Sequence, residues 1–491
     1  MAYILALDQG TTSCRAIVFN DRAEQVSVAQ QELTQHFPRA GWVEHDAGEI
    51  WTNQLAQARQ AIGAAGLLAA DISAIGITNQ RETTVIWNRA NGKPIGPAIV
   101  WQDRRTAALC DELREAGHEP AIEDKTGLVI DPYFSATKIR WMLDNIAGAQ
   151  EEARAGRLAF GTMDSWLIWN LTGGKTHATD ASNASRTMLF NINTGQWDED
   201  LLEIFDIPAS LLPEVVANVG PICRCDNELF SAAIPVTGMA GDQQAALFGQ
   251  ACTMPGLAKN TYGTGCFALI NTGQARIMSR HRMLSTVAWD NGQGETTYAI
   301  EGSVFVGGAV IQWLRDGLGI IEKSGDVESL ARSVGDNGGV ALVPAFAGLG
   351  APHWNADARG LICGLTRGST SAHIARAALE GIAFQVDDVL QAMKSDSHIA
   401  IKELRVDGGG AKNELMMQFQ ADISGIPIAR AACSESTALG AALMAGMGAG
   451  LFEMDELSSL WKSDKIFTPQ MSRDEAAARK LFWNKALARC Q

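Results

Sequence analysis

A short pattern that occurs twice constrains the fold of this chain more than any other feature. Near the N-terminus an apolar run, residues 4–7, leads through Asp8 into the turn Gly-Thr-Thr-Ser and a second apolar run. Half a chain later the stretch Thr-Tyr-Gly-Thr-Gly-Cys, residues 261–266, precedes the apolar run 267–270. Each copy predicts a strand and a tight turn in which glycine lets the backbone approach an anion closely. Two such hairpins indicate two domains that face one nucleotide.

The first turn carries the groups that a phosphate-binding hairpin needs. The amides and hydroxyls of Thr11, Thr12 and Ser13 can donate to phosphate oxygens, and Asp8 can hold a magnesium ion through water. A single copy is equally well explained as a tight β-turn that binds nothing, and it is the repeat that favours phosphate binding. The sequence lacks the P-loop motif, a Gly-x-Gly-x-x-Gly fingerprint after a strand, the His-Glu-x-x-His zinc motif and the Gly-x-Ser-x-Gly elbow.

Length and charge narrow the class of protein further. A chain of 491 residues, 46% of them hydrophobic and 19% charged, can form two sizeable globular domains, each with its own core. A net charge of −15 argues against nucleic acid or an anionic membrane as the main partner. The nine cysteines are scattered, which fits reduced thiols in the cytoplasm better than a disulfide framework.

We expect no signal peptide and no integral membrane segment. The N-terminal residues run directly into an apolar strand. The longest uncharged stretch, residues 436–452, is about one helical turn too short to cross a bilayer and is rich in alanine and glycine. It therefore predicts a buried, closely packed helix.

Strand-like and helix-like runs alternate along the chain, which predicts an α/β protein with layered sheets. The strand-like runs are 4–7, 74–78, 84–87, 95–101, 267–270, 339–343 and 403–406. The helix-like runs are 48–68, 103–116, 135–145, 372–393 and 413–424. By symmetry between the two hairpins we place the domain boundary between residues 248 and 249, so that residues 1–248 and 249–491 form the two domains.

Two clusters of polar residues follow predicted strands in the first half of the chain. Arg81 and Glu82 follow the run 74–78, where α/β sheets bind ligands, and together they suit a small polyol. An exposed ion pair worth under about 1 kcal/mol explains them as well. Asp242 follows another apolar run and can take a proton from an attacking hydroxyl, as a catalytic aspartate does in phosphoryl transfer. It can equally serve as a helix N-cap.

A third cluster lies in the second half. The run Asp-Gly-Gly-Gly-Ala-Lys-Asn, residues 407–413, takes a strand through a glycine turn into a helix that opens near Asn413. Such a turn lets the backbone lie flat against a base or ribose. A glycine loop alone is weak support, and its place after a strand in the second half strengthens it.

Several longer motifs, in the right order, resemble the FGGY carbohydrate kinases over essentially the whole chain, and within that family its glycerol-phosphorylating members. The matching segments are the run Tyr-Phe-Ser-Ala-Thr-Lys-Ile-Arg-Trp-Met at 133–142, residues 360–364 with 373–374 and 377–380, and the runs 76–84, 180–190 and 241–249. The resemblance implies a two-domain actin-like, ribonuclease-H-like ATPase fold with the active site in the cleft between the domains.

The resemblance also implies roles for individual positions. Asp242 is expected to be catalytic, and Asp8 to hold Mg²⁺. The remaining positions fall into three groups. Glycerol contacts are expected at Arg81, Glu82, Tyr133, Asp242 and Gln243; nucleotide contacts at Thr11, Thr12, Ser13, Arg15, Thr264, Gly308, Gln312, Gly409 and Asn413; and an apolar wall at Trp101 and Phe267. Ordinary core packing is the alternative explanation for the last two.

The implied reaction is transfer of the γ-phosphoryl group of ATP to glycerol with Mg²⁺, which yields sn-glycerol 3-phosphate and ADP and begins glycerol catabolism. The resemblance further implies a cytoplasmic enzyme that forms a homodimer or homotetramer. A kinase for another polyol or ketose, and a non-catalytic sensor or chaperone-like ATPase on the same fold, remain the alternatives.

One segment departs from the regulated bacterial relatives, which carry a Gly- and Arg-containing fructose 1,6-bisphosphate site or a phosphorylatable histidine there. Residues 223–234 read Cys-Arg-Cys-Asp-Asn-Glu-Leu-Phe-Ser-Ala-Ala-Ile, with neither feature. We therefore expect no inhibition by fructose bisphosphate and no activation by histidine phosphorylation through this segment.

Overall fold

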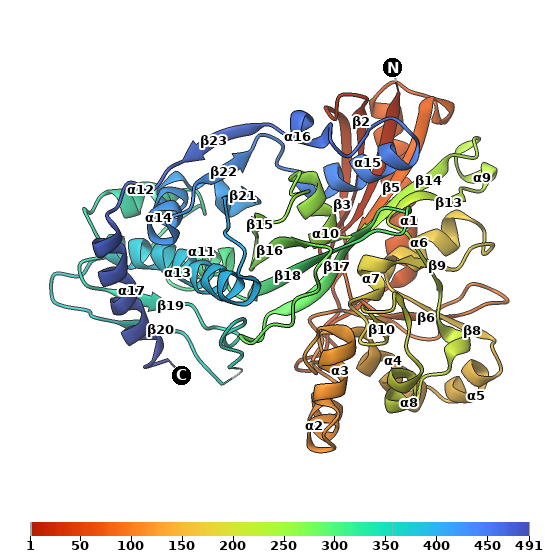
Figure 1. Cartoon of the computed structure of the whole chain (residues 1–491), viewed down its shortest axis with the longest axis horizontal. Coiled ribbons are helices and arrows are strands. Elements are labelled where there is room, and N and C mark those ends of the chain that lie inside the picture. The colour runs from red at the N-terminus through yellow and green to blue at the C-terminus, as the bar shows by residue number, and fades with distance from the viewer. Residues whose placement is uncertain (1, 356, 491) are drawn as a thin grey trace.

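The computed structural model describes residues 2–355 and 357–490, and two sheets organise them (Figure 1). Within these residues the first sheet has six strands, in the order β13-β14-β5-β1-β2-β3. Their bounds are β1 Tyr3–Gln9, β2 Ser13–Asn20, β3 Gln25–Glu32, β5 Ile72–Asn79, β13 Val219–Arg224 and β14 Pro235–Gly241. β1 pairs antiparallel with β2 and parallel with β5.

The second sheet repeats this arrangement. Among the described residues it has seven strands, in the order β17-β18-β16-β15-β21-β22-β23. Their bounds are β15 Leu257–Tyr262, β16 Cys266–Gly273, β17 Leu284–Asp290, β18 Thr296–Val304, β21 Glu403–Asp407, β22 Ile428–Ala431 and β23 Ser463–Phe467. β15 pairs antiparallel with β16 and parallel with β21, as β1 does with β2 and β5. Both hairpins expected from the repeated turn are therefore present.

The central strands of the first sheet are buried on both faces because each carries a continuous apolar run. In β1, Leu5 and Leu7 pack on one face with α1 (Ala47–Ala64) and α6 (Met163–Leu171). Ile4 and Ala6 pack on the other face with α10 (Asp242–Gly249) and α15 (Ser436–Gly448). Successive side chains of a strand point to opposite faces, so a continuous apolar run requires cover on both sides.

Helix α10 lies between the two sheets and sets the position of the site at its N-terminus. Phe248 packs edge-on against Trp289 of β17 with ring centroids 5.2 Å apart. The apolar cluster that contains α10 takes residues from the strands of both sheets, including Ala6 and Leu269. The opposite face of the second sheet is covered by α11 (Gly308–Asp316), α12 (Asp326–Arg332), α13 (Ser371–Ser397) and α14 (Glu414–Ser424).

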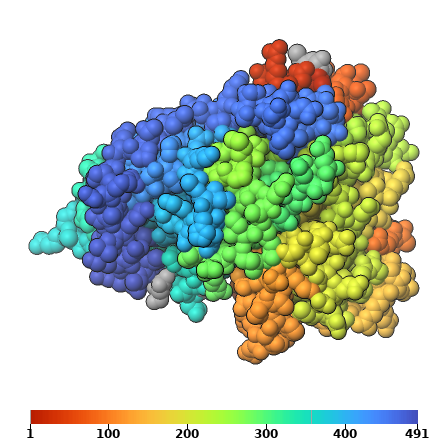
Figure 2. Space-filling model, viewed as in Figure 1, coloured from red at the N-terminus to blue at the C-terminus, as the bar shows by residue number. Residues whose placement is uncertain are grey.

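Helix α15 packs against the first sheet without room for side chains at the contact. A Cβ atom at Gly440 would lie 1.8 Å from the carbonyl oxygen of Ala245 in α10, and one at Gly76 in β5 would lie 2.1 Å from that of Ala441. The buried helix expected at 436–452 is thus confirmed, and it ends at Gly448. Figure 2 shows the C-terminal part of the chain, in blue, lying against the N-terminal strands, in red. The division into residues 1–248 and 249–491 stays a prediction.

The remaining elements surround this frame. The small two-stranded sheets pair β4 (Glu44–His45) with β7 (Ala98–Ile99), β6 (Val85–Asn88) with β8 (Leu158–Gly161), β9 (Ala178–Asp180) with β12 (Glu214–Val216), β10 (Phe190–Asn191) with β11 (Gln196–Trp197), and β19 (Ala341–Val343) with β20 (Leu361–Cys363). The other helices are α2 (Ala107–Glu115), α3 (Glu119–Thr126), α4 (Ser135–Asn145), α5 (Ala149–Arg154), α7 (Ala181–Ala184), α8 (Glu199–Phe205), α9 (Asn227–Phe230), α16 (Leu457–Leu460) and α17 (Arg473–Leu487). None of the described helices is long and apolar enough to span a membrane.

The helix expected at 103–116 and the strand expected at 95–101 are both shorter than their sequence patterns predict. The expected helix 103–116 begins only at Ala107, because the carboxylate of Asp103 accepts from the backbone N–H groups of Val43 and Arg105 and holds a turn instead. The expected strand 95–101 is regular only over β7, where it pairs with β4. Both differences arise from tertiary contacts, which local sequence propensity does not predict.

Candidate active site

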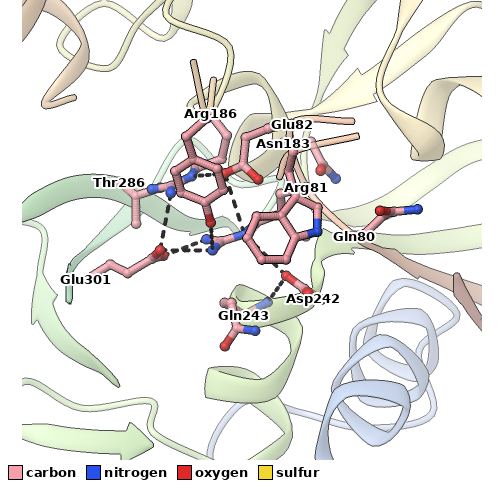
Figure 3. Close-up of polar contacts among 12 residues, drawn as sticks. Gln80, Arg81, Glu82, Asn183, Arg186, Asp242, Gln243, Thr286 and Glu301 are labelled. Atoms are coloured by element: carbon pink, nitrogen blue, oxygen red, sulfur yellow. Dashed lines mark hydrogen bonds and ion pairs between the residues drawn. The ribbon is translucent and has the colours of Figure 1, made fainter. Parts of the chain in front are cut away.

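The predicted substrate residues meet where two parallel strands end. Asn79 at the end of β5 lies opposite Gly241 at the end of β14. Arg81 follows the first strand and Asp242 follows the second, so that their side chains face each other, as Figure 3 shows. The distance from Nε of Arg81 to Oδ1 of Asp242 is 3.2 Å. Two residues 161 positions apart are thus brought into contact by strand pairing.

Arg81 is the centre of this cluster, and its main partner comes from the second sheet. Its Nη1 and Nη2 donate to the two carboxylate oxygens of Glu301 in β18, at 2.5 and 2.9 Å. Nη1 also donates to Gln244 at 3.2 Å, and Nη2 to the hydroxyl of Tyr133 at 3.4 Å. The side chain of Arg81 is 2% exposed, so the alternative of an exposed surface ion pair is wrong.

The main partner of Glu82 is Arg186, and not its sequence neighbour Arg81. Its Oε1 accepts from Nε of Arg186 at 2.7 Å, whereas Arg81 Nε is 3.9 Å away. Arg186 also donates to Glu301 at 3.2 Å. Burial raises the pKa of Glu82 against the pull of both arginines. Burial alone would raise the pKa of Glu301 too, but Arg186 and Arg81 lower it to about 2.

The carboxylate of Asp242 is partly exposed, and its pKa is raised. Its side chain remains 31% exposed, while those of Arg81 and Glu301 are closed off. Partial loss of hydration at this carboxylate raises its pKa above the ordinary value, and Arg81 and Lys259 oppose that rise. The helix N-cap is Gly241, so Asp242 is the first helical residue of α10 and its Oδ1 accepts from the backbone N–H of Gln243. The N-cap assignment was wrong by one residue.

Gln243 is held by a buried lysine that the sequence patterns did not single out. Nζ of Lys259 in β15 donates to Oε1 of Gln243 and, at 3.1 Å, to the hydroxyl of Thr261. Burial lowers the pKa of Lys259 to about 8, although Asp407 and Asp242 favour its charged form. The amide side chain of Gln243 is therefore oriented from the second sheet.

The predicted aromatic positions form one group beside this cluster. The ring of Trp101 lies 5.5 Å from that of Tyr133 and 6.4 Å from that of Phe267 in β16, edge-on in both cases. The loop that carries Tyr133 is fixed by Lys138, whose buried ammonium donates to the carbonyl oxygens of residues 132, 133 and 134. All three rings are partly exposed, unlike typical core residues.

The first hairpin turn leaves Thr12 exposed at its tip. Thr11 Oγ1 accepts from the indole N–H of Trp101 at 2.9 Å, and Ser13 Oγ accepts from Gln30 at 3.1 Å. The turn is closed by the N–H of Gly10, which donates to the carbonyl oxygen of Ser13 at 2.9 Å. Of the three predicted phosphate-binding residues of this turn, Thr12 is thus the most exposed.

Arg15, expected near the transferring phosphoryl group, is paired with carboxylates. Its guanidinium contacts Glu435, the N-cap of α15, and lies 3.6 Å from Asp8. Burial raises the pKa of Asp8 to about 6 against the attraction of Arg15, and Glu435 and Asp242 add to the rise. A divalent cation would relieve this crowding of carboxylates.

The donor set at Asp8 fits Mg²⁺ better than a metal held by protein ligands alone. Among the described residues no group of three or more His, Cys, Asp or Glu side chains could hold a metal ion. Mg²⁺ commonly binds through one or two carboxylates, water and substrate phosphates, and needs no such group. Asp8 supplies one buried carboxylate beside the predicted phosphate turn.

The predicted nucleotide residues of the second half gather at the β15–β16 turn. The carbonyl oxygen of Gly263 accepts from the N–H of Gly308, and that of Thr264 from Gly307 and Ala309, at 2.8–3.1 Å. The turn therefore packs on the N-terminus of α11. Gln312 lies one turn further along this helix and is exposed.

The glycine turn after β21 lies against the same hairpin. Gly408 has φ +84°, and a Cβ atom there would lie 2.6 Å from the carbonyl oxygen of Tyr262. Gly409 is exposed and has open space where a Cβ would stand. Asn413 is the N-cap of α14, and its Oδ1 accepts from the N–H of Met416 at 2.9 Å. Its amide nitrogen takes no part in this cap.

Three charged residues of the site, Arg186, Glu301 and Lys259, were missed by sequence reasoning. Each is completely buried, and burial of a charge requires a partner that the sequence does not reveal. An available signal was a single charge inside an otherwise uncharged strand, as at Glu301 in the run Thr-Tyr-Ala-Ile-Glu-Gly-Ser-Val and at Lys259 in Leu-Ala-Lys-Asn.

Each of the two sheets contains an antiparallel hairpin and a third strand that pairs parallel with it, and the polar residues of the site lie where the two sheets meet. This arrangement defines a two-domain protein of the actin-like ATPase class. Models of the N-terminal and C-terminal domains of the FGGY family of carbohydrate kinases match residues 3–249 and 258–449. The chain belongs to this family.

Several relatives are similar over nearly their whole length. A glycerol kinase of Rhodopirellula baltica is 60% identical over 99% of this chain and 90% of that protein, and one of Deinococcus radiodurans is 58% identical over 100% and 97%. In structure the chain is similar to Plasmodium falciparum glycerol kinase with ADP, with a TM-score of 0.94 and 38% identity over 100% of this chain and 98% of that one. A xylulose kinase from Lactobacillus acidophilus, 22% identical over 99% and 97% with a TM-score of 0.90, shares the fold.

Proposed function

We propose that this protein transfers the γ-phosphoryl group of ATP to glycerol and releases ADP and sn-glycerol 3-phosphate, which begins glycerol catabolism. The observation that carries the proposal is the partly exposed Asp242 carboxylate 3.2 Å from the buried Arg81 guanidinium, at adjacent strand ends. This arrangement suits a small molecule with several hydroxyl groups. The relatives named glycerol kinase support this substrate over a larger sugar.

Substrate hydroxyls are bound by charged and polar groups that are already held in place. Glu82 and Asp242 accept from them, Arg81 and Tyr133 donate, and Gln243 can do either. Trp101 and Phe267 form the apolar wall against the carbon chain. A site that pairs each hydroxyl rejects analogues that lack one, by up to about 10⁴-fold.

The transfer step then needs a base and an aligned phosphate. Asp242 accepts the proton of a terminal hydroxyl as that oxygen forms a bond to the γ-phosphorus of ATP. The bond from this phosphorus to the β–γ bridging oxygen breaks, and ADP leaves with the electron pair. Positioning and electrostatic stabilisation supply most of the acceleration in such transfers.

Residues of both hairpins hold the nucleotide. Thr11, Thr12 and Ser13 donate to its phosphate oxygens, and Arg15 offsets their charge once it leaves Glu435. The remaining contacts come from the second half: Thr264, Gly308, Gln312, Gly409 and Asn413. Asp8 holds Mg²⁺ through water, and the ion, when bound, neutralises charge on the phosphates.

The protein is further expected to act in the cytoplasm as a homodimer or homotetramer. Its nine cysteines are all free thiols, which suits a reducing compartment. Residues 1–248 would supply the glycerol and phosphate contacts, and residues 249–491 the nucleotide contacts. Sedimentation of the purified chain measures the assembly, and a monomer at micromolar concentration contradicts the oligomer.

A coupled assay of ADP release with and without glycerol tests the proposed activity. Ribitol, xylulose and gluconate are assayed in parallel at equal concentration. We expect glycerol to give the highest kcat/KM and little release without an acceptor. Preference for another acceptor would make the protein a different polyol or ketose kinase. Nucleotide binding without turnover on any acceptor would favour a sensor ATPase.

A further inference from the structure

We propose that Glu301 of β18 is a positioning residue of the substrate site, which acts by fixing the guanidinium of Arg81. The inference deepens the proposed function and rests on it. Glu301 lies 220 positions from Arg81 in sequence and belongs to the other sheet. Figure 3 shows its carboxylate facing Arg81 from the side opposite Asp242.

The contact has the two-pronged geometry that fixes a guanidinium in one plane. Nη1 of Arg81 donates to Oε2 of Glu301 at 2.5 Å, and Nη2 donates to Oε1 at 2.9 Å. Two parallel bonds prevent rotation about the end of the side chain, which a single bond would allow. The orientation of the whole guanidinium group is therefore set by Glu301.

That orientation decides where the other donors of Arg81 point. With both terminal nitrogens bound to Glu301, Nε faces Asp242 at 3.2 Å, and the remaining N–H groups face Gln244 at 3.2 Å and the Tyr133 hydroxyl at 3.4 Å. These longer contacts are the ones that a substrate hydroxyl can replace or share. The short contacts to Glu301 are structural.

Glu301 is itself fixed by its neighbours, so it can orient the guanidinium of Arg81. Its backbone pairs with Leu269 of β16 on one side and Leu284 of β17 on the other, so it lies on an interior strand. Its side chain is 0% exposed, and Arg186 donates to the same Oε1 at 3.2 Å. Arg186 also binds Glu82. The carboxylate of Glu301 therefore orients Arg81 directly and Glu82 through Arg186, and both are expected to bind the polyol.

Replacement of Glu301 by glutamine is the direct test. The amide keeps the shape but offers one acceptor, and its NH₂ group opposes the second guanidinium nitrogen. We expect Glu301→Gln to raise KM for glycerol at least about tenfold while KM for ATP changes less than about twofold. Glu301→Asp keeps the charge on a shorter stem and is expected to give an intermediate KM for glycerol, about threefold above that of the original chain.

Asp387→Asn is the matched control. Asp387, on α13, is another buried carboxylate of the second half. It pairs with Lys480 at 2.6 Å, away from the substrate residues. It is expected to leave both KM values unchanged, so that a general effect of neutralising a buried acid is separated from the effect at Arg81. Thermal unfolding of each variant measures the loss of stability independently.

Two results would overturn the role of Glu301. One is a KM for glycerol within twofold of the original in folded Glu301→Gln, or in Glu301→Asp where the glutamine variant does not fold. The other is an equal rise in both KM values, which indicates general damage. Failure of the unaltered chain to phosphorylate glycerol would instead overturn the proposed function, so the two failures are distinguishable.

Discussion

At the scale of the residue, the most consequential group is the carboxylate of Asp242. Replacing it with asparagine removes the proposed base but keeps the size of the side chain and its bond to the Gln243 N–H. We expect Asp242→Asn to lower kcat about 10²–10⁴-fold, the usual contribution of a general base. Calorimetric titration with ADP should show nucleotide affinity unchanged within about threefold. A variant that turns over at nearly the normal rate would remove Asp242 from the role of base.

The same residue predicts how activity depends on pH. A base works in its deprotonated form, so the rate falls as pH drops through its pKa. Partial loss of hydration raises the pKa of Asp242 above the ordinary value, and the charges of Arg81 and Lys259 reduce but do not cancel the rise. We therefore expect kcat/KM for glycerol to decline at a pH clearly above about 4, the ordinary range of an aspartate. A profile that is flat down to pH 4 would contradict this.

Asp8 predicts the requirement for magnesium. Its buried carboxylate beside the phosphate turn is the expected anchor of the hydrated ion. We expect Asp8→Asn to raise the Mg²⁺ concentration that gives half-maximal rate about tenfold or more, with partial recovery at high Mg²⁺. Asp21→Asn, an exposed position just after β2, is the control. Equal Mg²⁺ dependence of the two variants would exclude Asp8 as the anchor.

At the scale of the element, the packing of α15 on α10 determines stability. Gly440 has no space for a methyl group, because a Cβ atom would lie 1.8 Å from the carbonyl oxygen of Ala245. We expect Gly440→Ala to lower the free energy of unfolding by about 1–3 kcal/mol, the range seen for overpacked cores. Denaturant titration measures this change.

Gly63→Ala provides the comparison for that variant. Gly63 is an exposed glycine in the last turn of α1, where a Cβ atom would meet no neighbouring group within 4 Å, and alanine there favours the helix by up to about 1 kcal/mol. Equal effects of the two substitutions would mean that the α15–α10 contact is not tightly packed. Because α10 carries Asp242 at its N-terminus, loosening this contact also predicts a lower kcat in Gly440→Ala.

Elements also show where sequence reasoning succeeded. The strands at 4–7, 74–78 and 403–406 and the helices at 135–145 and 413–424 are present within a few residues, because apolar runs and helical periodicity are local signals. The ends were less accurate. Ala65 and Gly66, with φ +69° at the glycine, end α1 before residue 68, and Asp103 delays α2 through its bond to Val43.

At the scale of the whole molecule, residues of both sheets make up the proposed substrate site, and we expect this sharing to limit the reaction of ATP with water. Arg81 and Asp242 come from one sheet, whereas Glu301 and Lys259 come from the other. A site complete only when both halves enclose a substrate excludes water. We expect ADP release without glycerol to be at least about 10²-fold slower than with saturating glycerol. Comparable rates in the two conditions would mean that the halves do not exclude water.

The local chemistry of this protein could be predicted from its amino-acid order: twin hairpins with glycine turns, an arginine–glutamate pair after one strand, an aspartate after another and a buried helix of small residues. Each of these depends on neighbours in the chain, whose spacing the backbone sets directly. Which charged side chains contact each other became known only from the packing of the two sheets. Glu301 lies 220 positions from Arg81 and Glu435 lies 420 positions from Arg15, and contacts at such separations follow from how two sheets pack, not from local propensity.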